Sequence, residues 1–168
     1  MQKRTLLTAL GGVAALAAGV LAFPGAAMAA NPSTISNPMQ TVCLEPEGKS
    51  MNRGVLILQA PCDGSAAQRW TRDGLHYINL GSGLCLSAGH VPTEAGHIQT
   101  SQWPCNRNSE LNWESGSSVP GAVTSLISRI SGTRDKCLEL PGGSPWPGNG
   151  AWLSRCNGQL AQQWLIPG

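Results

Sequence analysis

The sequence repeats one short pattern three times, and this repeat limits the possible folds more than any other feature. Each copy, here called a unit, contains a Cys-Leu pair, a second Cys and then a Trp. The copies are Cys43-Leu44, Cys62 and Trp70 in unit one; Cys85-Leu86, Cys105 and Trp113 in unit two; and Cys137-Leu138, Cys156 and Trp164 in unit three. The two Cys are 19, 20 and 19 positions apart, and the Trp follows the second Cys by 8 positions each time. Units of roughly 40 to 50 residues cannot each bury a core, so the repeat predicts three units closed around a shared axis.

The first 29 residues have the organisation of a secretory signal peptide. A basic start at Lys3 and Arg4 precedes an uncharged, mostly apolar run from Leu6 to Leu21, and small residues surround the cleavage point at Ala29. This pattern predicts a signal peptide over 1–29 and a secreted, extracellular protein that keeps no membrane attachment after cleavage. The alternative is an uncleaved anchor, because the run is only a little shorter than the roughly 20 residues of a bilayer span.

Beyond the signal peptide we expect a short linker over 30–39 and one domain over 40–168. Without Lys3 and Arg4, the 11 basic residues become 9 and balance the 9 acidic residues. A neutral domain with scattered charges lacks the basic surface that nucleic acids and anionic membranes attract. Neither is expected as a partner.

Export would place the six Cys in an oxidising environment, where an even count in a small domain indicates a disulfide framework. Six Cys allow 15 pairings. If each unit is one structural element, each bridge closes within its unit, as Cys43–Cys62, Cys85–Cys105 and Cys137–Cys156. Each closed loop of about 20 residues would then contribute on the order of 3 kcal/mol.

The local pattern favours an all-β fold. Short apolar stretches bounded by turn residues occur at 54–58, 75–80 and 125–130, and Arg72-Asp73-Gly74-Leu75 is a good hairpin turn. No segment beyond the signal peptide carries a helical apolar period over ten or more residues. In Gln68-Arg69-Trp70 and Gln162-Gln163-Trp164, we expect Gln and Trp to share one face of a strand, with the Trp in the core and the Gln tying down a loop.

These three Cys-Leu…Cys…Gln-x-Trp units resemble the ricin-B-type β-trefoil lectins and carbohydrate-binding modules. The resemblance covers about residues 40 to 168, although unit two has Leu111-Asn112-Trp113 in place of Gln-x-Trp. It implies a six-stranded barrel capped by three hairpins, with up to one shallow sugar pocket in each unit. It also implies a non-catalytic protein that binds a glycan or polysaccharide and needs no cofactor.

A sugar pocket needs an aromatic face for the C–H surface of the ring and polar groups for the hydroxyls. In the family, these are an Asp two residues after the first Cys, an aromatic residue two before the second Cys, and an Asn-Gln pair that opens Gln-x-Trp. The corresponding residues are Glu45, Ala60 and Ala67-Gln68 in unit one; Ser87, Trp103 and Glu110-Leu111 in unit two; and Glu139, Ser154 and Ala161-Gln162 in unit three. No unit has the full set, so the pockets are expected to be partly degenerate.

Unit three comes closest to a complete pocket. It keeps Glu139 and Gln162, it offers Trp152 displaced by two positions, and Asn157 lies just beyond the bridge. The alternative interpretation is that Trp152 packs against a neighbouring unit and Gln162 braces a turn. Unit two keeps Trp103, with Glu94, His97 or Gln102 as substitutes for the lost polar groups. Unit one has no aromatic candidate, and its Glu45 and Gln68 are expected to be structural.

Catalytic and metal-binding interpretations find little support. His76, His90 and His97 lack the close spacing of a zinc site, and the disulfides use the thiols that could act as ligands or nucleophiles. No catalytic residue and no metal site are expected.

A second function class remains open, because trefoil surfaces can also bind proteins. Such a protein would be the recognition subunit of a secreted assembly or a protease-inhibitor-like scaffold with a secreted protein partner. The insertion at 114–124 is the candidate contact loop. Its Gly and Ser content predicts a flexible loop, which would raise the ordering cost of binding.

Overall fold

The computed structural model describes residues 34–38, 41–92, 97–130, 134–141 and 148–167. Every regular element in these ranges is a strand or a short 3-10 turn, which confirms the all-β prediction. In the same part of the chain, no helix has the length and apolar composition of a membrane span. The predicted signal peptide lies outside the described residues.

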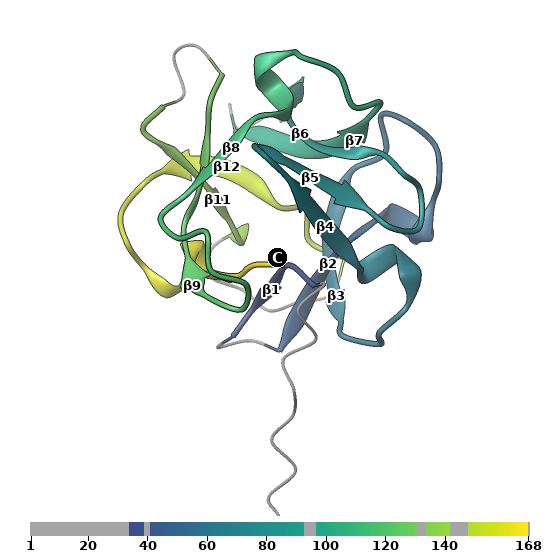
Figure 1. The fold of residues 1–168 in the computed structure, drawn as a ribbon, viewed down its shortest axis with the longest axis horizontal. Coiled ribbons are helices and arrows are strands. Elements are labelled where there is room, and N and C mark those ends of the chain that lie inside the picture. Colours follow the sequence, from purple (N-terminus) through teal and green to yellow (C-terminus); the bar gives the residue numbers. More distant parts are fainter. Residues whose placement is uncertain (1–33, 39–40, 93–96, 131–133, 142–147, 168) are drawn as a thin grey trace, which may run out of the picture.

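Within the described residues, thirteen strands form two antiparallel sheets around a central axis (Figure 1). The strands are β1 (Ser36–Asn37), β2 (Val42–Pro46), β3 (Ile57–Pro61), β4 (Trp70–Asp73), β5 (His76–Asn79), β6 (Cys85–Pro92), β7 (Ile98–Trp103), β8 (Trp113–Ser115), β9 (Val123–Thr124), β10 (Leu126–Ser128), β11 (Lys136–Glu139), β12 (Trp152–Arg155) and β13 (Trp164–Leu165). The sheet orders are β3-β2-β1-β13-β9 and β4-β5-β6-β7-β12-β11-β10-β8.

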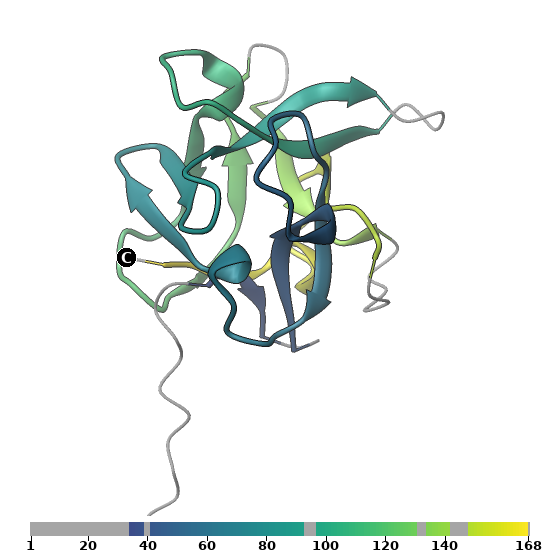
Figure 2. The same ribbon diagram turned by 90° about the vertical axis from the view of Figure 1, so that its right-hand side faces the viewer.

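Each unit contributes one long hairpin, formed by β2–β3, β6–β7 and β11–β12. Figure 2 shows the β6–β7 hairpin extending across one end of the molecule. The predicted turn at Arg72-Asp73-Gly74-Leu75 is confirmed, since Asp73 pairs with His76 around Gly74-Leu75. Strand β7 of unit two also pairs with β12 of unit three, so the hairpins of these two units are joined in one sheet.

The core is organised by the three repeated Trp residues. Trp70, Trp113 and Trp164 are fully buried. Each indole N–H donates to the carbonyl of the Leu that follows the first Cys of its own unit: Leu44 at 3.0 Å, Leu86 at 3.0 Å and Leu138 at 2.9 Å. Burying one indole contributes roughly 4 to 6 kcal/mol before the entropy cost. The prediction that these three Trp residues are structural is confirmed.

Three disulfides close within the three units. The bridges join Cys43 to Cys62, Cys85 to Cys105, and Cys137 to Cys156. The structure thus confirms the pairing expected from the repeat.

The Gln-x-Trp segments differ from their prediction. Gln68 ends a 3-10 turn over Ala66–Gln68, and Trp70 begins strand β4. Gln162 ends the equivalent turn over Leu160–Gln162, before Trp164 begins β13. The expectation that Gln and Trp share a strand face is therefore wrong. The chain turns because the Gln amide bonds across to the loop of its own hairpin, as described below.

The barrel begins before residue 40. Ile35 is fully buried, and β1 pairs with both β2 and the C-terminal strand β13 (Figure 1). The Asn37 side chain donates to the carbonyls of Leu160 and Gln163 at 2.8 and 3.1 Å. Ser36 and Asn37, which lie in the segment assigned to a linker from the sequence, thus form a strand of the sheet.

Asn79 of unit two makes a contact like that of Asn37, because its side chain donates to the main-chain carbonyl of Ala67 at 2.6 Å. Both Asn residues stand six positions before the first Cys of their unit. This shared spacing was the signal in the sequence that could have extended the domain to β1.

Candidate functional site

In unit three, Gln162 is fully buried and its amide is occupied by the protein itself. Its Nε2 donates to Glu139 Oε2 at 2.5 Å and to the carbonyl of Arg155 at 2.8 Å. Its Oε1 accepts the main-chain N–H of Asn157 at 2.8 Å. We call this Glu-Gln arrangement the bracket, because it ties the turn after the second Cys to the first strand of the hairpin.

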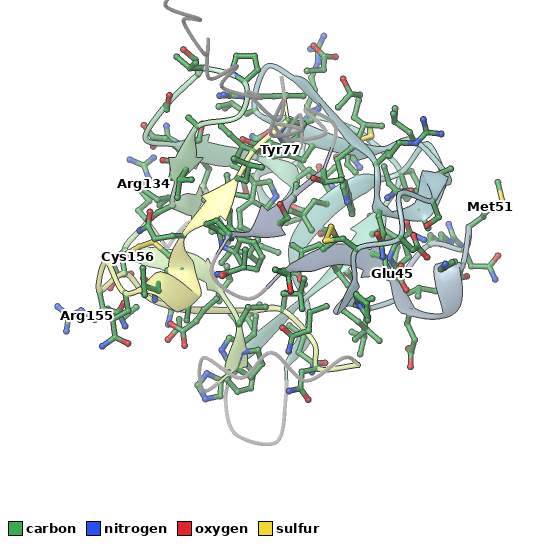
Figure 3. All side chains as sticks on the ribbon, turned by 90° about the horizontal axis from the view of Figure 1, so that it is seen from below. Glu45, Met51, Tyr77, Arg134, Arg155 and Cys156 are labelled. Atoms are coloured by element: carbon green, nitrogen blue, oxygen red, sulfur yellow. A yellow bond between two sulfur atoms is a disulfide. The ribbon has the colours of Figure 1, made fainter. Side chains whose placement is uncertain are left out.

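Unit one contains the same bracket. Gln68 Nε2 donates to Glu45 Oε2 at 2.9 Å and to the carbonyl of Pro61 at 2.8 Å. Gln68 Oε1 accepts the N–H of Asp63 at 2.7 Å. In Figure 3, Glu45 of unit one and Cys156 of unit three lie on different sides of the molecule, so the two brackets are separate structures.

Unit two has lost both members of the bracket. Ser87 stands where the other units have Glu, and Leu111 stands where they have Gln. Both residues are buried, and the Ser87 hydroxyl has no hydrogen-bond partner among the described residues. The predicted loss of the unit two carboxylate and amide therefore removes a structural pair as well as polar groups for a sugar.

Asn157 also has a repeated structural contact. Its Oδ1 accepts the N–H of Gln159 at 2.8 Å. Asp63 and Asn106, at the equivalent positions, accept the N–H two residues later at 2.8 and 2.7 Å. These contacts make the turn-bracing interpretation sufficient for Gln162 and Asn157, and their assignment to a sugar stays a prediction.

Trp152 and Glu139 face outward side by side. They are directly opposite each other in the β11–β12 pair, as are their neighbours Leu138 and Leu153. Both Leu side chains are buried in the core. Because side chains alternate between the faces of a strand, Trp152 and Glu139 lie on the opposite, outer face. Trp152 is two residues from Ser154, so its displacement along the strand preserves the face, as expected.

Trp152 also contacts unit two. Its indole stacks on the imidazole of His97, with ring centroids 4.1 Å apart and planes 10° from parallel. Trp152 pairs with Gln99 of β7 as well as with Glu139 of β11. This contact agrees with the alternative interpretation from the sequence, in which Trp152 packs against a neighbouring unit. The sequence indicated His97 only as a substitute within the unit two pocket and did not identify it as the partner of Trp152.

The indole N–H of Trp152 is buried and has no hydrogen-bond partner among the described residues. Leaving such a donor unsatisfied costs about 1 to 3 kcal/mol. Buried polar groups without partners are uncommon and need an explanation. Trp152 thus differs from Trp70, Trp113 and Trp164, whose indole N–H groups each donate to a main-chain carbonyl.

Trp103, the aromatic candidate of unit two, is used in packing. Its ring lies 3.6 Å from the position that a Cβ atom on Gly54 would occupy, and its N–H donates to Ser101 Oγ at 3.1 Å. The neighbouring Gln102 is buried and donates to the carbonyls of Ser50 and Asn52, both at 2.8 Å. These contacts join unit two to the hairpin loop of unit one.

The sequence also offered a carboxylate in each of the other two units, Glu45 in unit one and Glu94 in unit two. Leu58 stands opposite Glu45 in unit one, so that carboxylate has no aromatic residue beside it. Glu94, named as a substitute in unit two, lies outside the described residues. Among the residues that the structure describes, no three His, Cys, Asp or Glu side chains gather as metal ligands would.

Comparison with known proteins identifies the family. The sequence matches the family described as Ricin-type beta-trefoil lectin domain over residues 31–120, which is more than half of the 168 residues. A search of curated protein sequences found no significant match.

Solved structures share the fold. The designed three-fold symmetric protein ThreeFoil has a TM-score of 0.68 and 19% identity, covering 81% of this chain and 97% of its own. The C-terminal half of an earthworm R-type lectin, in complex with GalNAc, has a TM-score of 0.62 and 18% identity, covering 80% and 96%. The ricin B-like lectin of Macrolepiota procera, in complex with lactose, has a TM-score of 0.62 and 18% identity, covering 80% and 93%. With its three disulfide-closed units, its buried Trp repeat and this match, the chain belongs to the ricin-type β-trefoil lectin family.

Proposed function

We propose that this protein is a secreted, non-catalytic lectin whose principal site is the outer face of the β11–β12 hairpin. Membership of the ricin-type lectin family supports carbohydrate binding. The observation that carries the assignment to this face is the direct pairing of Trp152 with Glu139, both turned outward. This places an aromatic residue and a carboxylate directly opposite each other on adjacent strands, where paired Cβ atoms are about 5 Å apart.

The chemistry of the two groups is complementary. An indole face packs against the apolar C–H surface of a sugar ring. A carboxylate has two oxygens and several acceptor positions. Glu139 uses one oxygen for Gln162, so its other oxygen can accept hydroxyl donors from a sugar. Hydrogen bonds to a charged acceptor are roughly twice as strong as neutral ones.

The other two units are poorer sites. Unit one has the carboxylate Glu45 but Leu58 in place of the aromatic ring. Unit two has Trp103 but Ser87 in place of the carboxylate. With one complete pair of groups, we expect weak binding by a single site, without the gain in avidity that three equal sites give on a repetitive glycan.

Secretion is part of this proposal. It rests on the signal-like segment over 1–29 and on the three disulfides, which form and persist in oxidising compartments. Glycans on cell surfaces or in the extracellular medium are the partners that such a protein would meet.

A protein-binding function has one observation in its favour. Val119 and Val123 are exposed on the insertion, which the structure shows tied to the C-terminal strand and not free. Gly121 N–H donates to the carbonyl of Ile166 at 2.9 Å, and Ile166 N–H donates back to Ala122 at 3.1 Å. The low ordering cost of such a loop favours docking to a flat protein surface. The tight turn from Val119 to Ala122 differs from the extended strand that sheet-adding peptides adopt, which argues against a protease-inhibitor-like loop.

The first test compares Trp152→Ala with Trp103→Ala. Purified oxidised protein is passed over lactose and N-acetylgalactosamine resins, a glycan array, and insoluble galactan, xylan, mannan, chitin and cellulose. We expect Trp152→Ala to lose retention on the glycan that holds the wild type, and Trp103→Ala to keep it. Equal retention of the two variants would reject the assignment to unit three, and a wild type retained on none of these supports would reject the lectin function.

The second test uses the repeat as its own control. Glu139→Gln and Glu45→Gln remove the same carboxylate from the same bracket, so we expect equal losses of thermal stability. Only Glu139→Gln should weaken glycan binding, by about 10- to 100-fold for the loss of a charge-assisted hydrogen bond. Similar binding by both variants would show that the carboxylates act only in the brackets. Deleting 116–122 should leave binding intact, and lost glycan binding would favour the insertion instead.

A further inference from the structure

We propose that the sugar site is shared by two units, with His97 of unit two as a positioning residue that holds the indole of Trp152. His97 covers the indole face turned toward β7 and leaves the face turned toward Glu139 for the sugar. This inference rests on the lectin function proposed above. It adds a residue outside unit three and a direction of approach.

The strand register places His97 and Trp152 on one outer face. Trp152 pairs with Gln99 and Leu153 pairs with Ile98, where β12 of unit three meets β7 of unit two. Ile98 packs against the core cluster together with Leu153. His97 and Gln99 therefore point to the side opposite Ile98, the side on which Trp152 lies. A diagonal contact between His97 and Trp152 is within reach of aromatic side chains on neighbouring strands.

The stack defines which face of the indole is covered. The rings are 4.1 Å apart and 10° from parallel, so the imidazole lies flat on the indole. His97 immediately precedes β7, which lies on one side of β12, and Glu139 belongs to β11, which lies on the other. The face of the indole that does not contact His97 therefore looks away from β7, in the direction of Glu139.

Gln99 also lies on the side of Trp152 that is turned toward β7. Its Nε2 lies 3.1 Å from the position that a Cβ atom on Gly150 would take, so the amide rests closely on the backbone of the strand entry. Gln99 is also the direct pairing partner of Trp152. Gln99 and His97 thus both lie on the β7 side of Trp152, and His97 is the one in ring contact with the indole.

The indole N–H shows that a hydrogen bond does not position this ring. The indole N–H groups of Trp70, Trp113, Trp164 and Trp103 all donate to protein oxygens. The indole N–H of Trp152 has no such partner among the described residues. The stack on His97 is the ring contact that the structure gives for this indole, and it is therefore our candidate for what fixes the orientation of the ring. An aromatic ring that already has its binding orientation binds a sugar more tightly than a ring that must be ordered during binding.

The test measures affinity for the glycan that the wild type retains, using His97→Ala, His97→Phe and Trp152→Ala. His76→Ala is the matched control, because His76 lies at the start of β5 in the β4–β5 hairpin, away from this face. Trp152→Ala should abolish retention. His97→Ala should weaken binding about three- to tenfold, which matches the usual contribution of an aromatic pair. His97→Phe should restore affinity to within about twofold of the wild type, and His76→Ala should leave it unchanged.

A second readout makes the result independent of stability. The indole signal of Trp152 in a 1H–15N spectrum is assigned by its loss in Trp152→Phe. It should shift in His97→Ala, return toward its original position in His97→Phe, and stay in place in His76→Ala.

The outcomes separate the two proposals. Full affinity in His97→Ala, or failure of His97→Phe to restore binding, would overturn the role of His97 while Trp152→Ala still upholds the lectin site. Wild-type protein that binds no glycan, or Trp152→Ala that binds normally, would overturn the lectin site and this inference with it, whatever the spectrum shows.

Discussion

Units one and three contain the same bracket but differ in the residue that faces its carboxylate. Glu45 and Glu139 both accept from the Gln of their own unit, and that Gln holds the turn after the second Cys in both cases. Opposite the carboxylate, unit one has Leu58 and unit three has Trp152. The carboxylate alone is thus a structural feature, and the aromatic residue beside it distinguishes a candidate sugar site.

Unit two shows how the bracket can be absent. Ser87 and Leu111 replace Glu and Gln together, whereas Trp113 keeps its buried bond to Leu86. Removing both partners of a buried hydrogen bond can be nearly neutral, but removing one leaves the other unsatisfied. The buried Trp is therefore present in all three units, whereas the Glu-Gln bracket is present only in units one and three.

The largest expected effect concerns the feature that all units share. Trp70→Ala and Trp164→Ala should each lower the free energy of unfolding by about 3 to 5 kcal/mol, because each removes a buried indole and leaves a cavity. Urea denaturation of the oxidised protein measures this loss. The equivalence of units one and three would fail if one variant lost less than half as much stability as the other.

The bracket should give the next largest effect. Gln68→Leu and Gln162→Leu should each cost about 1 to 3 kcal/mol, since a partly buried carboxylate, a carbonyl and an N–H lose their partner. Pairing Gln68→Leu with Glu45→Ser copies the residues of unit two and should recover part of the loss. A double-mutant cycle by urea denaturation checks this coupling. Additive losses would show that the Glu-Gln contact carries no interaction energy of its own.

A smaller effect on stability is expected from a charged residue that is present in the turn of unit one and absent from the equivalent turn of unit three. Unit one has Asp63 where unit three has Asn157. The hydrogen bond from Lys49, followed by bonds from Ser65, lowers the pKa of Asp63 from its usual 3.8 to about 2. Because the pKa is lowered on folding, the pair stabilises the protein above about pH 4, and this contribution is lost as the pH falls toward 2. The pair is exposed, so the effect should be small and weakened by salt.

An NMR titration of the Asp63 carboxyl group measures this directly. Its midpoint should lie near pH 2 in the wild type and rise toward the ordinary value in Lys49→Met. Asp63→Asn should copy the turn of unit three and remove this part of the acid sensitivity. A midpoint near 4 in the wild type would show that the ion pair does not form in solution.

No gain is expected from giving unit one the aromatic residue of unit three. In a Trp152→Ala background, Leu58→Trp places an indole opposite Glu45 but should not restore glycan retention. Gly150 bridges to position 58 as Gln99 pairs with Trp152, so the position equivalent to His97 is Gly148, which has no side chain to stack on an indole. Restored retention on the same resin would show that a Trp and a bracketed Glu are sufficient without the His97 contact.

Much of the fold followed from the repeat. The spacing of Cys and Trp predicted the three units, the three bridges and the buried Trp residues, because covalent loops and large side chains impose regular spacing on a sequence. Strand β1 was missed because two residues are too short to show an alternating pattern. The 3-10 turn at Gln68 was missed because the bond that stabilises it joins residues that are 23 positions apart.

The candidate site followed from the sequence only in part. Alternation along a strand predicted that Trp152 would keep the face of the usual aromatic position, and the register agrees. The insertion at 114–124 was expected to be flexible from its composition. Its backbone bonds to Ile166 could not be foreseen, because composition does not reveal pairing with a distant strand.

The sequence by itself determined the number of units, their disulfides and their core, since these features depend on residue types at short, repeated separations. Only the tertiary structure decided which carboxylates have an aromatic neighbour and which face of that neighbour is covered. His97 and Trp152 are 55 positions apart and belong to different units, and their stacking depends on the register between β7 and β12. A shift of one residue in that register would turn one of the two rings to the other face of the sheet.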